Sequence, residues 1–132
     1  MARASWALLH DRPVIQNVLT LAPGGQKTTR NLLADTGAGN AHSEFDLLLE
    51  EHDCVVCGAK AAQTVSLGGA YAGLFPRYSL RVEIPQLGFD GQLLAVGVPN
   101  PPRQLDGIAC FRFLNRFTYG NFGNASEFGL ES

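Results

Sequence analysis

The chain has 132 residues, which is enough for one domain with its own core but not for two. Hydrophobic residues make up 45% and charged residues 17%, a balance typical of globular rather than disordered proteins. The formal net charge of -2 gives no electrostatic footprint for nucleic acid or an anionic membrane. No apolar run approaches the roughly 18 residues that a transmembrane helix requires. We therefore expect a single domain over residues 1–132, without a nucleic-acid or membrane partner.

The N-terminus and the cysteines bear on the compartment. Residues 1–10 contain one arginine and a short apolar patch, and His10-Asp11-Arg12 follows at once, which is not the pattern of a signal peptide. Cys54, Cys57 and Cys110 are an odd number of cysteines, and an odd number in a chain without an export signal favours free thiols. We predict a cytoplasmic protein with reduced cysteines.

The first predicted elements form a hairpin that leads into an acid. Residues 12–21 are predicted as a strand, 22–26 as a turn and 27–34 as a second strand. The second strand ends in an apolar run that continues as Asp35-Thr36-Gly37-Ala38. A buried strand with this ending presents a carboxylate at the floor of a cleft, and the glycine lets the chain turn sharply below it.

The middle of the chain is predicted to contain a second, projecting hairpin. Residues 44–52 follow a capping arrangement at residues 43–46, which favours a short helix over a buried strand. Residues 63–67 are predicted as a strand, residues 68–73 as a glycine-rich tip that can bend, and residues 78–84 as a half-buried strand with strict alternation. Residues 92–98 are a further, mostly apolar strand.

The C-terminal third is predicted to hold a helix and two short strands. Residues 106–110 lead into residues 111–117, whose apolar spacing fits a short helix, and residues 118–131 suggest two last strands around Gly-Asn turns. Mostly strands with one or two short helices indicates an all-β, barrel-like protein.

Three of these segments together resemble the retropepsin-like aspartic proteases, the retroviral-type single-domain group that includes bacterial members. They are Leu32-Leu33-Ala34-Asp35-Thr36-Gly37-Ala38, the glycine-rich hairpin, and Asp106-Gly107-Ile108 running into a helix. The resemblance covers nearly the whole chain. It implies an acid-protease barrel with a flap hairpin, and an aspartic endopeptidase, a hydrolase of peptide or protein substrates that needs no metal or cofactor.

The resemblance also implies roles for individual residues. Asp35 would be the catalytic acid and base, Thr36 would hydrogen-bond across a dimer axis, and Gly37 would contact the substrate backbone, with Ala38 completing the active-site loop. The flap would consist of residues around Gly68, Gly69, Ala70 and Tyr71, with Tyr71 at its tip. Phe128 and Leu130 would contribute to a dimer sheet built from chain termini.

The chemistry requires a second copy of the chain. Carboxylate catalysis of peptide hydrolysis uses two acids that share one proton across about 3 Å. The sequence contains one Asp-Thr-Gly, because Asp90-Gly91 and Asp106-Gly107 lack the hydroxyl residue. We therefore predict a homodimer that places Asp35 against its counterpart. The alternative is a catalytically silent domain of the same fold that binds peptides or mediates dimerisation.

Two positions depart from the family pattern. Cys110 stands where the family usually has a glycine before the C-terminal helix, and Gly39-Asn40 stands where many viral members carry acids that bind the substrate main chain. Neither position is the proposed catalytic acid.

The remaining candidates have simpler interpretations. Cys54 and Cys57 with His52 nearby have half the spacing of a zinc site, which leaves a small metal- or redox-sensing module as a more distant alternative. We favour solvent-facing or half-buried thiols near a loop. The phenylalanines of residues 111–117 are predicted as core. Arg112 and Arg116 are four residues apart, on one side of the predicted helix, which favours a solvated face.

Overall fold

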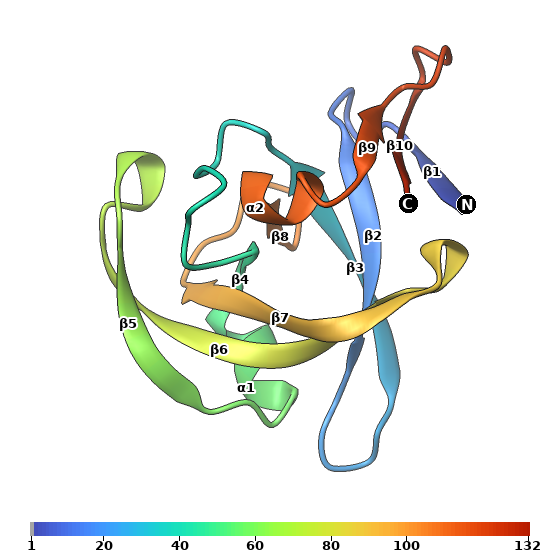
Figure 1. The fold of residues 1–132 in the computed structure, drawn as a ribbon. Helices are drawn as coiled ribbons and strands as arrows, with labels where there is room; N and C mark the ends of the chain where they lie inside the picture. Colours follow the sequence, from blue (N-terminus) through green and yellow to red (C-terminus); the bar gives the residue numbers. More distant parts are fainter. Residues whose placement is uncertain (1) are drawn as a thin grey trace.

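The computed structural model describes residues 2–132, which fold mainly into strands with two short α-helices (Figure 1). Strands account for 50% of the chain and helices for 12%. The elements are β1 (Arg3–Ala7), β2 (Val14–Thr20), β3 (Lys27–Ala34), β4 (Leu47–Glu50), α1 (Glu51–Val56), β5 (Ala61–Leu67), η1 (Gly69–Tyr71), β6 (Gly73–Ile84), η2 (Pro85–Leu87), β7 (Phe89–Val98), β8 (Gly107–Ala109), α2 (Phe111–Leu114), β9 (Thr118–Gly120) and β10 (Glu127–Glu131). Within residues 2–132, every helix is too short, or not apolar enough, to reach across a membrane.

Six strands close into a barrel, which confirms the predicted all-β, barrel-like class. Their order is β2-β3-β8-β4-β7-β6, and β6 returns to pair with β2 at Val18↔Glu83 and Leu19↔Val82. Two of the pairings, β3–β8 and β4–β7, are parallel. The β5–β6 hairpin extends beyond the closed part of the barrel (Figure 1).

Strict alternation along residues 78–84 correctly predicted which side chains face the core. Tyr78, Leu80, Val82 and Ile84 are all buried, whereas the residues between them are exposed or half-buried. Side chains of a strand point alternately to the two faces of a sheet, so one face of β6 fills the barrel. Burial of each such aliphatic side chain stabilises the fold by roughly 1.5–3 kcal/mol.

The helix predicted over residues 44–52 is wrong, because this segment contains β4 followed by α1. Leu47 and Leu49 are 0% exposed and Leu48 is 5% exposed. The strand pairs with β7 and β8 along its two edges. Leu47 and Leu49 belong to one core cluster and Leu48 to another, so both faces are covered and the apolar residues show no alternation. Ser43 does not cap a helix; its hydroxyl accepts the backbone N–H of Asn40 (2.8 Å) within a loop.

The C-terminal helix is shorter than expected, because α2 ends at Leu114 rather than at residue 117. Phe113 is buried and Phe117 is half-buried, and both rings meet Phe89 edge to face at 5.5 and 6.1 Å. These two aromatic residues are core, as expected.

The two chain termini form a separate three-stranded sheet in the order β1-β10-β9 (Figure 1). The two predicted C-terminal strands are present, and β1 is an additional strand that the sequence interpretation missed. Leu130 is 0% exposed and belongs to the chain's own core. Phe128 is half-buried and lies against Tyr119, with ring centroids 6.3 Å apart. Since β10 is the middle strand, both of its edges are already paired within the chain.

Candidate active site

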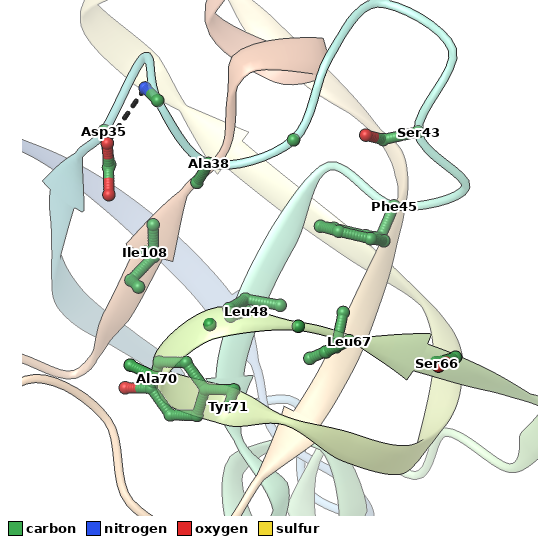
Figure 2. Close-up of a pocket in the computed structure, with 14 residues that line it drawn as sticks. Asp35, Ala38, Ser43, Phe45, Leu48, Ser66, Leu67, Ala70, Tyr71 and Ile108 are labelled. Carbon is green, nitrogen blue, oxygen red and sulfur yellow. Dashed lines mark hydrogen bonds between the residues drawn. The ribbon is translucent and has the colours of Figure 1, made fainter.

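Asp35 is the first residue after β3, and three hydrogen bonds fix the turn that carries it. Its backbone N–H donates to the carbonyl of Ala109 (3.1 Å), at the end of the parallel neighbour β8. Its Oδ1 accepts the N–H of Gly37 (2.9 Å; Figure 2), and its carbonyl accepts the N–H of Ala38 (3.1 Å). Asp35 is half-buried and Thr36 and Gly37 are exposed. The carboxylate is thus held by the barrel while its loop faces solvent.

The segment after β8 supports this turn from behind. The N–H of Phe111 donates to the carbonyl of Ala38 (2.9 Å), and the N–H of Cys110 donates to the carbonyl of Asp46 (3.0 Å). Cys110 is completely buried, in a cluster with Leu48 and other aliphatic residues. Its backbone is extended, with φ -86° and ψ 167°, so this position does not need a glycine.

The thiol of Cys110 stays protonated at neutral pH. Burial raises its pKa to about 12, and the carboxylates of Asp35 and Asp46 act in the same direction. A buried, protonated thiol behaves as a small hydrophobic side chain. The side chain of Cys110 is therefore part of the packing behind the Asp35 turn.

A cavity of about 570 Å³ separates the Asp35 loop from the tip of the β5–β6 hairpin (Figure 2). Of the predicted site residues, Asp35, Gly37, Ala38, Gly68, Gly69, Ala70 and Tyr71 line it, and Thr36 does not. The structure therefore brings the two predicted halves of the site, which are about 30 residues apart in sequence, to opposite walls of one cavity. Among residues 2–132, Asp35 is the only charged side chain that lines it.

Seven further residues line the cavity and were not predicted as site residues. They are Gly39, Ser43, Phe45, Leu48, Ser66, Leu67 and Ile108. Ser66 and Leu67 belong to the hairpin, and their place just before its glycine-rich tip could have indicated them. Phe45 and Leu48 gave no usable signal, because their segment was predicted as a helix.

The hairpin tip lies over the cavity and is anchored at its stalk. Residues Gly69–Tyr71 form a 3-10 turn, and Gly69 has φ +66°, a conformation that glycine adopts without strain. Tyr71 is half-buried against the same aliphatic cluster as Cys110, and this desolvation raises its pKa. Lower on the hairpin, Arg77 Nη1 donates to the carbonyl of Glu44 (3.1 Å). The hairpin and the loop after Asp35 are thus joined by a direct hydrogen bond.

Arg112 and Arg116 are partly exposed to solvent, at 33% and 39%, but they also pair with a buried carboxylate that their spacing did not reveal. Both approach Asp46, a carboxylate only 1% exposed, with Arg116 Nη2 at 2.8 Å and Arg112 Nε at 3.6 Å from Oδ1. The other oxygen of Asp46 accepts the N–H of Leu94 (3.0 Å), and Arg112 also donates to the carbonyl of Ser43 (3.0 Å). The two arginines therefore hold the loop that precedes β4.

Cys54 lies in α1 and Cys57 directly follows this helix. Neither residue lines the cavity beside Asp35. Cys54 is buried and Cys57 is half-buried. Burial raises the pKa of Cys54 to about 12, with further increases from Cys57, Asp53 and Glu51. In the part of the chain that the structure describes, no group of three or more His, Cys, Asp or Glu side chains is placed to hold a metal ion. The metal-sensing alternative therefore lacks a complete donor set in this region.

Comparison of the chain with protein-family models, with characterised proteins and with solved structures finds no match in any of the three. What the protein does is therefore inferred from its own residues and their geometry.

Proposed function

We propose that the protein is a retropepsin-like aspartic endopeptidase that acts as a homodimer. The observation that carries the proposal is the cavity with Asp35 on one wall and a bendable hairpin tip on the other. Peptide hydrolysis by carboxylates needs an acid beside a groove that admits an extended chain and a cover that excludes water. The Asp35 loop and the β5–β6 hairpin supply one half of this arrangement.

The second half would come from a second copy of the chain. Asp35 is the single charged lining residue in residues 2–132, and one carboxylate cannot at the same time take a proton from the water and donate a hydrogen bond to the scissile carbonyl. A twofold axis beside the exposed Thr36 and Gly37 would bring the two Asp35 side chains together. Two carboxylates about 3 Å apart share one proton, since they cannot both ionise at that distance.

The proposed reaction divides the work between the two acids. The ionised Asp35 takes a proton from a water molecule, whose oxygen attacks the carbonyl carbon of the scissile peptide. The protonated Asp35 of the second copy donates a hydrogen bond to the carbonyl oxygen and stabilises the developing oxyanion. Collapse of the tetrahedral intermediate breaks the C–N bond as the leaving nitrogen takes the proton that the first Asp35 removed from the water, which returns the pair to one shared proton.

The test is cleavage of an unfolded protein at mildly acidic pH by wild type, Asp35→Asn and Asp90→Asn. Asp90 is a matched control because it also precedes a glycine but is exposed, in an ion pair with Arg81. We expect Asp35→Asn to lose activity by at least roughly 10³-fold and Asp90→Asn to retain it. A statine-type transition-state mimic should block the wild type.

A mixing experiment tests the dimer. If each site needs one Asp35 from each copy, an excess of Asp35→Asn chains should suppress wild-type activity as mixed dimers form. Full activity in that mixture would contradict a shared site. A dimer that cleaves nothing at any pH would instead support the catalytically silent domain.

A further inference from the structure

A second cavity, of about 410 Å³, has the thiol-bearing residue Cys57 in its wall and shares no lining residue with the cavity beside Asp35. The chain that follows α1 forms one wall, the turn between β2 and β3 forms another, and residues of β6 and β7 form the third. Ser79, Arg81 and Gln92 make the third wall polar. A polar cavity of this kind gives a small, water-soluble molecule access to Cys57.

Cys57 is the accessible member of a pair of thiols. It is half-buried, whereas Cys54 is 0% exposed and belongs to the core of the barrel. Cys110 is also 0% exposed, and neither Cys54 nor Cys110 lines the second cavity. A reagent in solution can therefore reach Cys57 in the folded protein, but it reaches the two buried thiols only when the structure opens.

Helical geometry holds the two thiols of the pair close together. Cys54 lies in α1, and Cys57 ends the same turn with φ -77° and ψ 0°, its N–H donating to the carbonyl of Asp53 (3.3 Å). Residues three apart in a helix have Cβ atoms about 5–6 Å apart, and a disulfide requires about 3.5–4.5 Å. A shift of about 1–2 Å at Cys57, the last residue of the turn, would close this difference.

We propose that Cys57 is a site of modification by small disulfides of the glutathione type, and that Cys54 resolves the adduct. The Cys57 thiolate attacks one sulfur of the small disulfide, which breaks that S–S bond, forms a mixed disulfide and releases one thiol. The Cys54 thiolate then attacks the sulfur of Cys57 and displaces the second thiol, in a step that is intramolecular because both sulfurs lie on one turn. The two cysteines lose two electrons and two protons, which reduce the small disulfide to two thiols.

The surroundings of Cys57 set the rate of the first step. Burial and the carboxylate of Asp53 raise the pKa of this thiol, and Arg30 acts in the opposite direction. Because the thiolate is the form that reacts, exchange is slow at neutral pH and becomes about tenfold faster with each pH unit below the pKa. We therefore expect the site to respond to sustained oxidising conditions.

The test incubates the folded protein with oxidised glutathione at about pH 8.5, near the ordinary pKa of a free thiol, and maps the products by mass spectrometry. Wild type should form the Cys54–Cys57 disulfide at least roughly tenfold faster than Cys110 reacts. Cys54→Ala should stop at a mixed disulfide on Cys57, and Cys57→Ala should keep its other thiols reduced. Asp35→Asn should behave like wild type, because no step involves Asp35.

Cys110→Ala is the matched control, because it removes a buried thiol that does not line the second cavity; it should form the disulfide like wild type. Wild-type thiols that stay reduced in the folded protein but react in urea would overturn the proposal. Unchanged reaction of Cys54 in Cys57→Ala, or a wild-type reaction that ends at a stable adduct on Cys57, would also overturn it. If Cys54→Ala does not fold, the wild-type map alone decides, because the adduct, the disulfide and the reduced pair differ in mass.

Discussion

The backbone N–H of Asp35 donates to the carbonyl of Ala109 at 3.1 Å, so the proposed catalytic acid is fixed to the end of β8. β3, which ends just before Asp35, runs parallel to β8. The last three residues of β3 pair with the three residues of β8, from Leu32 with Gly107 to Ala34 with Ala109. β8 has three residues and both of its neighbours belong to the barrel. Substitutions in β8 should therefore change the position of Asp35 even where the substituted side chain does not contact Asp35.

Gly107→Ala tests how tightly β8 packs against β4. A Cβ at this position would lie 2.2 Å from the backbone carbonyl oxygen of Leu48, so β4 and β8 would have to separate. We expect a loss of about 3 kcal/mol or more in the free energy of unfolding, measured by urea denaturation. Gly68→Ala is the control, because a Cβ there meets no atom within 4 Å and φ is -115°. Equal stability of the two variants would contradict the tight packing of β4 on β8.

Cys110→Ala tests whether the thiol behind the Asp35 loop stabilises the protein by packing or strains the loop. Cys110 is fully buried among aliphatic side chains, so removal of its sulfur leaves a small cavity. We expect stability to fall by about 1–2 kcal/mol and cleavage to persist, because the backbone bonds of this segment do not involve the side chain. A variant that is more stable than wild type, with higher activity, would instead show that the thiol strains the site.

The buried thiols predict a loss of stability at alkaline pH. In the folded protein the pKa values of Cys54 and Cys110 are about 12, against an ordinary value of 9.0. The folded state therefore keeps protons that the unfolded state releases, so stability is complete below about pH 9 and declines as pH rises toward 12. Each thiol contributes a slope of about 1.4 kcal/mol per pH unit inside that window.

The measurement is the urea midpoint of wild type and of a Cys54→Ala, Cys110→Ala double variant between pH 7.5 and 10.5. The double variant should start lower and show a shallower decline, because it lacks the two thiols whose pKa values are raised in the folded protein. Parallel curves for the two proteins would mean that the thiols do not contribute to the decline.

Sequence patterns predicted the parts of this fold in which local rules decide the outcome. β3 has the predicted bounds, 27–34, and residues 78–84 of β6 show the predicted alternation of buried and more exposed side chains. Residues 47–49 carry no such signal, because a strand covered on both faces is uniformly apolar. The partners of Arg112 and Arg116 were equally hidden, since Asp46 lies about 70 residues earlier and spacing within a helix reveals only local pairs.

The same limit applies to the candidate site. Asp35 and the glycine-rich tip were predicted because their segments resemble the active-site loop and flap of retropepsin-like proteases, and the structure brings both to one cavity. Phe45 was not found, because its contribution depends on how the loop of residues 39–46 crosses the barrel. That path is set by contacts with α2 and β6, which come much later in the sequence.

Asp46→Asn tests whether the buried carboxylate positions this loop. The change keeps the shape of the side chain but removes the charge that faces Arg112 and Arg116. Loss of one partner of a buried ion pair is strongly destabilising, but both arginines reach solvent, at 33% and 39% exposure, so we expect a reduced loss of about 2 kcal/mol. Asp90→Asn breaks an ion pair of two exposed side chains and should change stability much less.

The loop also gives Asp46→Asn a signature beyond stability. Asp46 follows Phe45 directly, and its carbonyl accepts the N–H of Cys110 behind the Asp35 turn. Disturbance of this residue should lower cleavage of an unfolded protein by severalfold, under conditions in which the variant is fully folded. Arg116→Lys keeps a cation beside Asp46 and should retain most of the activity. If Asp46→Asn lowers stability while its rate of cleavage equals that of wild type, Asp46 supports the barrel and does not position the segment behind Asp35.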